Sequence, residues 1–324
     1  MIRALSLLES LVAAGLKFMF KGGTSLILLL PEPRRFSVDV DIVTEHSRED
    51  LEISFDEIIK AKAFKRWELD ERRSYKGGIP KAHYKFYFDS AFDPNGYVLL
   101  DVVFDKHRYP TTQITSVQSS WVKIDGKPTL VETPNIDSIL GDKLTAFAPN
   151  TTGVLFGKEK SLEIVKQLHD VGQLFDHIDD ISIVAKSFEN SVDQGIAYRK
   201  LHISREHVLD DIIATSAMIA KLAKHHGEDE KSKFEEIVYG LKQFRGYTIT
   251  GNFTLDNAIE SAAKSAYLAA KIKAWDNTPI EKPIKTDSPF QFTEMPYSAL
   301  NRLRKFNNGS MFYWTKTAGL LGLK

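Results

Sequence analysis

The sequence predicts two domains: an α/β domain with a mixed, twisted sheet over residues 1–133, and a mainly helical domain over residues 134–324. Three observations predict this division. Stretches of β-forming residues occur before residue 105, helical periodicity dominates after residue 134, and 324 residues are more than one ordinary domain needs. We expect the helical domain to complete a cleft that the first domain begins.

In the first domain, short helices and strands alternate along the chain. The first helix is expected at 2–14, where Ile2, Leu5, Leu8 and Val12 form one apolar stripe. Alternating or continuous β-formers predict the strands of a mixed sheet, and helices are expected to pack against it. The remaining elements are helices at 24–30 and 49–63, a strand carrying the pair Asp39 and Asp41, and strands at 18–20, 66–74, 82–88 and 97–104.

In the second domain, apolar residues recur with helical spacing and strand signals nearly vanish. The expected helices are 136–147, 159–177, 206–225, 230–245 and 254–274. The segment 276–289 carries three prolines and no periodicity, which predicts a loop or linker. Residues 290–324 are rich in aromatic side chains and are expected to pack on the body of the protein.

The composition excludes several classes of protein. Cysteine is absent, which excludes disulfides, thiolate catalysis and Cys-ligated metal sites. No apolar run approaches the ~20 residues of a membrane span, and the first residues lack a signal-peptide pattern, so we expect a cytoplasmic protein without a membrane partner. The formal net charge is zero, so any contact with nucleic acid requires a local basic patch.

The most informative feature is a pair of aspartates one residue apart, Asp39 and Asp41. Side chains two positions apart in a strand share a face. We therefore expect both carboxylates to project together, while Val38, Val40 and Ile42 fill the opposite face. Adjacent carboxylates repel each other unless a cation is close. Their hard oxygens suit Mg²⁺ or Mn²⁺, which indicates phosphoryl chemistry.

Just before this pair, a glycine turn opens a short apolar helix. Gly22 and Gly23 would let a backbone approach an anion closely, and Thr24 and Ser25 lie at a helix start, where unpaired N–H groups attract phosphate. The alternative is a plain strand–helix turn with an N-cap. The Asp-x-Asp strand downstream favours the phosphate site.

A third carboxylate is needed if two metal ions are to be held. Asp101 stands within a run of β-formers, where an aspartate is costly unless it is paired or binds a metal. Asp105 shares its face but ends the strand, where a capping or turn role is favoured. Asp101 is therefore the expected third ligand.

Two further charged residues are candidates in the helical half. Lys143 falls in the middle of the apolar stripe of helix 136–147, so it either snorkels to a carboxylate or neutralises nucleotide phosphates. Asp170 lies at the margin of the buried stripe of the next helix, where it either joins the site or forms an i,i+4 surface pair with Lys166.

These residues together resemble a known family. The segment Lys-Gly-Gly-Thr-Ser-Leu, followed by Arg35-Phe-Ser37-x-Asp-x-Asp-Ile, is similar to the AbiEii/AbiGii-type toxins within the DNA polymerase β-like nucleotidyltransferase superfamily. A later Lys-x-x-Ala and a Lys-Asp-x-x-Asp helix are typical of the family. They correspond here to Lys143–Ala146 and to His169-Asp170, with Gln173 in place of the second acid. The resemblance covers roughly residues 17–176.

The resemblance implies a metal-dependent nucleotidyltransferase that moves a nucleoside monophosphate from an NTP to the 3′ end of tRNA, with a separate antitoxin as partner. Under this hypothesis Asp39, Asp41 and Asp101 hold Mg²⁺ or Mn²⁺, and the catalytic set also includes Lys143 and Asp170. The residues expected to bind the nucleotide, or to support those that do, are Lys21, Gly22, Gly23, Thr24, Ser25, Arg35 and Ser37. Arg35 could instead pair with the aspartates.

Two alternatives stay open at this point. The acceptor could be a hydroxyl of a protein or of a small molecule, which the zero net charge favours. The chain could also be a non-catalytic, partner-binding relative, although three costly carboxylates argue against a lost site.

Overall fold

The computed structural model describes residues 1–74, 78–90, 93, 95–119, 121–122, 125–222, 227–283 and 290–324. The chain divides into two compact units, Met1–Asn135 and Ile136–Lys324. Among the described residues, none of the helices combines the length and the apolar character needed to cross a bilayer.

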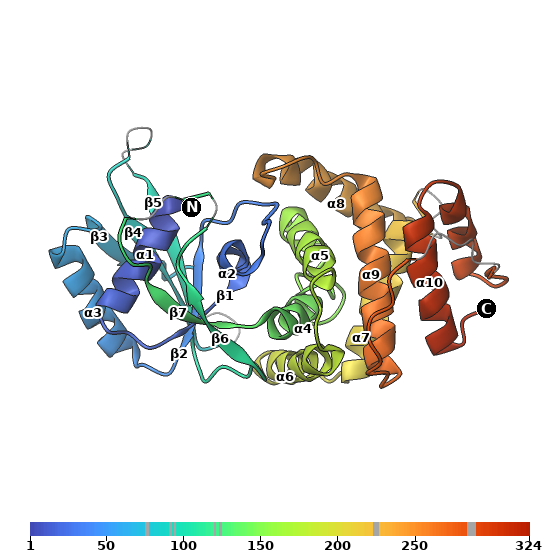
Figure 1. Cartoon of the computed structure of the whole chain (residues 1–324), viewed down its shortest axis with the longest axis horizontal. Coiled ribbons are helices and arrows are strands. Elements are labelled where there is room, and N and C mark those ends of the chain that lie inside the picture. Colours follow the sequence, from blue (N-terminus) through green and yellow to red (C-terminus); the bar gives the residue numbers. More distant parts are fainter. Residues whose placement is uncertain are drawn as a thin grey trace. The chain divides into compact units, whose positions relative to one another are not determined.

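The first unit is built on a seven-stranded mixed sheet with the order β3-β4-β5-β2-β1-β7-β6 (Figure 1). Two strand pairs, β2–β5 and β1–β7, are parallel and the other pairs are antiparallel. The strands are β1 Met19–Lys21, β2 Val40–Thr44, β3 Arg66–Leu69, β4 Lys81–Tyr87, β5 Tyr97–Phe104, β6 Thr112–Ser116 and β7 Leu130–Pro134. The mixed sheet expected from the sequence is therefore confirmed.

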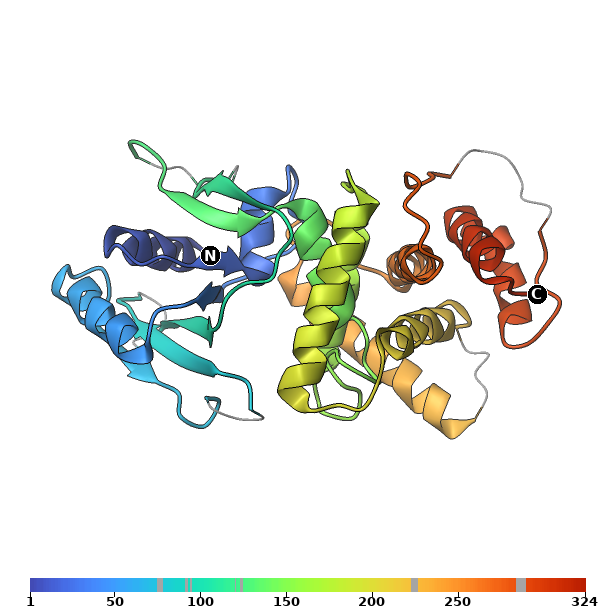
Figure 2. The ribbon, with the colours of Figure 1, turned by 90° about the horizontal axis from the view of Figure 1, so that it is seen from below.

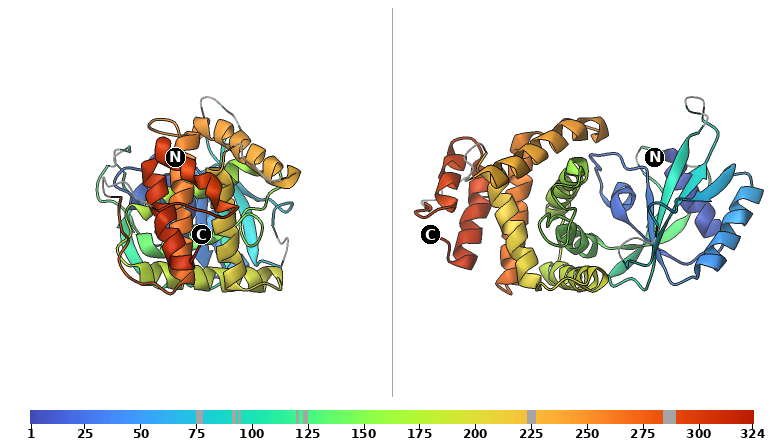
Figure 3. Two further views of the ribbon diagram at one scale, coloured as in Figure 1. Left: turned by 90° about the vertical axis from the view of Figure 1, so that its right-hand side faces the viewer. Right: turned by 180° about the vertical axis from the view of Figure 1, so that it is seen from behind.

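Three helices flank this sheet: α1 (Ile2–Ala13), α2 (Gly22–Leu29) and α3 (Arg48–Lys60). Figure 1 and the right-hand view of Figure 3 show α1 and α3 on one side of the sheet and α2 on the other. The apolar residues of α1 and α3 form one core with Val40 and Ile42 of β2, both fully buried. Because side chains alternate along a strand, the residues between and beyond these two project toward the α2 side.

The second unit is helical, as predicted. Its elements are α4 Ile136–Ala146, α5 Ser161–Phe175, α6 Ile181–Arg199, α7 Arg205–Ala220, α8 Glu228–Phe244, η1 Arg245–Tyr247, α9 Leu255–Lys273, η2 Tyr297–Lys305 and α10 Asn308–Leu321. Figure 2 shows α6 beside α4, and α5 packs against α4, α8 and α9.

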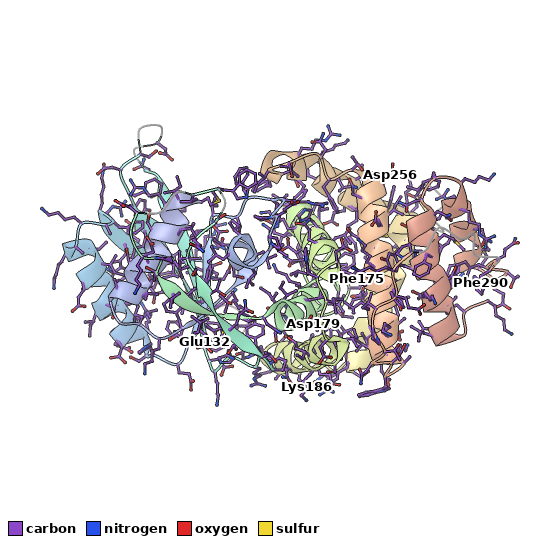
Figure 4. The ribbon with its side chains drawn as sticks, in the orientation of Figure 1. Glu132, Phe175, Asp179, Lys186, Asp256 and Phe290 are labelled. Atoms are coloured by element: carbon purple, nitrogen blue, oxygen red, sulfur yellow. The ribbon has the colours of Figure 1, made fainter. Side chains whose placement is uncertain are left out.

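The carboxy-terminal segment packs on the helical body through aromatic rings. Phe175, labelled in Figure 4, ends α5, and its ring centroid lies 5.3 Å from that of Tyr313 and 6.3 Å from that of Tyr267. These two tyrosines belong to α10 and α9. Trp314 of α10 is fully buried and Tyr313 is 3% exposed, so these aromatic residues pack on the body of the unit, as expected, whereas Phe306 is 48% exposed.

The structure also departs from the expected elements. Strands β6 and β7 and helices α6 and α10 were not predicted as such. The strand expected at 66–74 ends at Leu69, because the backbone carbonyl of Asp70 accepts from the N–H groups of Arg73 and Ser74 and forms a turn. The helix expected at 206–225 ends at Ala220, since Leu222 follows in a turn with a φ of +56°. Residues 223–226 and 284–289, which include the ends of predicted segments, lie outside the described residues.

Candidate functional site

The turn from β1 into α2 packs directly against a carboxylate. Lys21, the last residue of β1, lies opposite Asp41 in the antiparallel pairing of β1 with β2. Gly22 has a φ of +78°, in the left-handed region that favours glycine. A Cβ on Gly22 would overlap Oδ2 of Asp41 and lie 2.5 Å from its Cγ. The close approach between this turn and Asp41 therefore requires glycine.

The second glycine makes room for the segment before β2. A Cβ on Gly23 would lie 2.6 Å from Nη2 of Arg35 and 2.8 Å from Oγ of Ser37. Arg35 is 8% exposed, and its Nη1 donates to the backbone carbonyl of Phe36 at 3.1 Å. The sequence-predicted residues Arg35 and Ser37 thus lie against the start of α2.

Two hydroxyl groups in the first turn of α2 tie these parts together. Thr24 Oγ1 donates to the backbone carbonyl of Asp39 at 2.5 Å, and Ser25 Oγ donates to the carbonyl of Gly22 at 2.9 Å. Both side chains are fully buried. Their side-chain oxygens therefore hold the backbone of the site in place, while contact with an anion would fall to backbone N–H groups of the helix start.

The paired aspartates lie at the beginning of β2. Asp41 is within the strand and Asp39 immediately precedes it; both are half-buried. Val40 and Ile42 fill the opposite face, as predicted, but Val38 is 50% exposed. The expectation for Val38 is wrong because the regular strand begins only at Val40.

Asp101 is the direct neighbour of Asp41 across the sheet. The parallel pairing of β2 with β5 places Asp41 opposite Asp101, so both side chains lie on the same face. On the other side of Asp101, the antiparallel pairing with β4 places His83 opposite. Nδ1 of His83 lies 2.5 Å from Oδ1 of Asp101, and Nη2 of Arg73 lies 3.8 Å from Oδ2.

His83 is a residue that sequence reasoning missed. It lies in a predicted strand, but the local sequence pattern does not predict which strand pairs with it or in which register. A single histidine in such a strand gives no signal until the sheet places it beside an aspartate.

The acidic residues fit a divalent ion that is completed by its substrate. Among the described residues, no group of three His, Cys, Asp or Glu side chains is gathered closely enough to hold a metal ion unaided. Mg²⁺ is usually bound by one or two carboxylates together with substrate phosphates and waters, rather than by a protein cage. Asp39 and Asp41 are suited to this role, because the turn that packs on Asp41 opens helix α2, and the N–H groups of a helix start attract phosphate.

Lys143 and Asp170 meet in the interior of the second unit. Lys143 of α4 places Nζ 2.9 Å from Oδ2 of Asp170 and 3.2 Å from Oε1 of Gln167, both on α5. The two charged side chains are 10% and 1% exposed. The interpretation of Asp170 as part of a surface pair is therefore wrong, because packing between helices buries it. Lys143 does meet a carboxylate, which is one of the two alternatives for it.

His169, next to Asp170, is a buried structural side chain. Its ring centroid lies 4.9 Å from that of Phe244 and 5.0 Å from that of Phe253, and its Nδ1 lies 3.4 Å from Oδ1 of Asp170. The aromatic contacts fix the ring beside the carboxylate. In this chain, His169 therefore helps to enclose the Lys143–Asp170 pair.

The chain matches one family model and is similar to a solved structure. The family model described as "Nucleotidyl transferase AbiEii toxin, Type IV TA system" matches residues 3–242, a range that includes every candidate site residue predicted from the sequence. A solved structure, the nucleotidyltransferase toxin MenT4 from Mycobacterium tuberculosis, is similar with a TM-score of 0.51 at 11% sequence identity, covering 98% of this chain and 92% of that one. That likeness shows the fold. No curated protein matches the chain.

Proposed function

Because the chain belongs to the AbiEii family of nucleotidyl transferase toxins of type IV toxin–antitoxin systems, we propose that it transfers a nucleoside monophosphate from an NTP to the 3′-terminal hydroxyl of tRNA, with release of pyrophosphate. The observation that carries the proposal is the packing of the Gly22 turn on the carboxylate of Asp41. It sets a helix start, which attracts phosphate, beside the acidic residues that suit a divalent ion. A cognate antitoxin protein is the expected partner.

The residues of the first unit divide this work among them. Gly22 and Gly23 let Asp41, Arg35 and Ser37 pack closely on the start of α2. The N–H groups of this helix start would bind the triphosphate, and Arg35 would add positive charge for the phosphates. Asp39 and Asp41 would hold Mg²⁺ or Mn²⁺, and Asp101, opposite Asp41 in the sheet, would join them as third ligand once the ion is bound. Such an ion would neutralise phosphate charge and lower the pKa of the attacking hydroxyl.

The remaining predicted residues support the same reaction. Lys21 lies in register with Asp41 at the turn, and Ser37 packs on Gly23 next to Arg35. We also propose Lys143 as a cation for the nucleotide phosphates; its Nζ lies 2.9 Å from Oδ2 of Asp170.

A second acceptor class has one observation in its favour. The formal net charge of the chain is zero, whereas binding to nucleic acid draws on Lys and Arg contacts to phosphate. A hydroxyl on a protein or a small molecule would then replace the tRNA end, with the same nucleotide chemistry.

The test incubates the purified protein with each labelled NTP, Mg²⁺ and total tRNA. Labelled, nuclease-sensitive product from the wild type, and its loss in Asp41→Asn, would support the proposal. Protease-sensitive or small labelled product would indicate the second acceptor class. If no NTP gives a labelled product and calorimetry detects no Mg²⁺-dependent NTP binding, the result would favour the hypothesis of a non-catalytic, partner-binding protein.

The chain offers a matched control for this substitution. Asp105 follows β5 and lines a cavity of about 330 Å³ with Thr44, His46 and Glu132, the last labelled in Figure 4. Thr44 ends β2, whereas Asp41 lies near its beginning. Asp105→Asn removes the same charge from the same sheet, away from the glycine turn, and should retain transfer activity.

A further inference from the structure

A cross-strand row of polar side chains runs through the candidate site. Lys21 pairs with Asp41, Asp41 with Asp101, and Asp101 with His83 across four neighbouring strands. Paired residues in a sheet present their side chains on the same face. The row therefore ends at His83, whose ring reaches the carboxylate at 2.5 Å.

The backbone of His83 is fixed by a turn of the preceding segment. Its N–H donates to Oγ of Ser74 at 3.0 Å, and its carbonyl accepts from the N–H of Asp70 at 2.7 Å. Ser74 Oγ in turn donates to the carbonyl of Asp70 at 2.9 Å. His83 is 7% exposed and Ser74 is 3% exposed. Hydrogen bonds thus hold both the backbone and the imidazole ring of His83.

The bond between the ring and the carboxylate has a defined direction. An ionised carboxylate can only accept, so Nδ1 of His83 carries the proton and donates to Oδ1 of Asp101. This bond fixes the rotation of the Asp101 carboxyl group, so that the other oxygen, Oδ2, points away from the imidazole. Oδ2 lies 3.8 Å from Nη2 of Arg73, a side chain that is 45% exposed.

We propose that His83 is a positioning residue for nucleotide transfer: by binding Oδ1 of Asp101 it presents Oδ2 as a ligand for the divalent ion. This inference rests on the proposed function, which assigns that ion to Asp39, Asp41 and Asp101. Hydrogen-bonding partners of metal-ligating carboxylates orient them, and removing such a partner typically lowers metal affinity by about 10–100-fold.

The experiment measures Mn²⁺ binding without turnover, by electron paramagnetic resonance titration of the full chain. His83→Leu, which fills the buried site with an apolar side chain and removes the donor, should weaken Mn²⁺ binding by about 10–100-fold. In parallel transfer assays, kcat should fall while KM for tRNA stays unchanged. His83→Asn should restore most of the binding, since its amide nitrogen can occupy nearly the place of Nδ1.

Two controls separate positioning from loss of structure. Tyr84→Phe removes a hydrogen bond of 3.1 Å to Glu52 from the next residue of β4, on the opposite face of the sheet, and should leave Mn²⁺ affinity unchanged. His83→Gln carries its amide one bond further out, near the place of Nε2. If His83→Leu fails to fold, the contrast between His83→Asn and His83→Gln makes the same test.

The outcomes are distinct from those of the proposed function. Wild-type Mn²⁺ affinity in His83→Leu, or equal affinity in His83→Asn and His83→Gln, overturns the positioning role, as does a wild type that binds no Mn²⁺. A wild type that binds Mn²⁺ in a His83-dependent way but transfers no nucleotide supports the positioning of Asp101 and contradicts the proposed transfer.

Discussion

Replacing Gly22 by alanine should damage the candidate site far more than it damages the fold. The added Cβ would lie 2.8 Å from the Cβ of Asp41 and 2.5 Å from its Cγ. Carbon atoms in contact normally lie ~3.5–4.0 Å apart, so the Asp41 side chain and its strand must move by about 1 Å. A flexible side-chain end could swing away, but a Cβ moves only with its backbone.

The expected magnitudes follow from this displacement. Alanine at a φ of +78° costs about 1–2 kcal/mol of folding free energy. A misplacement of about 1 Å in a catalytic constellation can cost about 10²-fold in rate. The transfer rate of Gly22→Ala should therefore fall about 100-fold, which corresponds to about 2.7 kcal/mol of transition-state stabilisation.

Gly15→Ala is the matched control, because Gly15 has a φ of +77° and a Cβ there would meet nothing within 4 Å. Both variants pay the backbone strain, and only Gly22→Ala displaces Asp41. Initial rates of nucleotide transfer and urea unfolding curves should be measured for both. Equal transfer rates in the two variants would refute the reasoning that the turn sets the position of the carboxylate.

Two further predictions concern the second unit. Lys143→Met removes the cation from a carboxylate that is 1% exposed and should lower the free energy of unfolding by about 3–5 kcal/mol. The double variant Lys143→Met/Asp170→Leu should recover part of this loss in urea unfolding. An equal loss of unfolding free energy in the single and the double variant would contradict a buried pair. Hydrogen bonding from Lys271 lowers the pKa of Asp276 from 3.8 to about 2, so its contribution to stability is present above the ordinary value and is lost as the pH falls toward 2. Asp276→Asn should lower the Tm at neutral pH and reduce the fall in Tm on acidification; parallel Tm curves for variant and wild type would count against this pair.

Local patterns predicted the elements that carry strong periodicity or β-propensity. The strand 97–104 matches β5, and helix 136–147 matches α4 to within one residue. Helix α6 was not predicted, although its buried apolar positions, Ile181, Val184, Phe188 and Val192, lie three or four residues apart, which is helical spacing. Short strands such as β6, in which only Thr115 is buried, do not show the alternation of apolar and polar residues by which a strand is predicted.

The residues of the candidate site also fall into those that local sequence predicts and those that it does not. Motif and strand pattern predict the glycine turn and the aspartates Asp39, Asp41 and Asp101, because neighbouring residues in the sequence are enough to identify them. His83 and the burial of Asp170 depend on register and helix packing, which join residues far apart in the chain. Such contacts follow from the assembled sheet and bundle, and no local window of sequence contains them.

The central claim is that the Asp39–Asp41 site adds nucleotides to RNA. Intact mass spectrometry of tRNA, after incubation with NTPs, Mg²⁺ and either wild-type or Asp41→Asn protein, measures this directly. We expect the wild type to raise the tRNA mass by whole nucleoside monophosphates at the 3′ end, and Asp41→Asn to leave the mass unchanged. Unchanged tRNA with the wild type, or equal addition by the variant, would contradict the account.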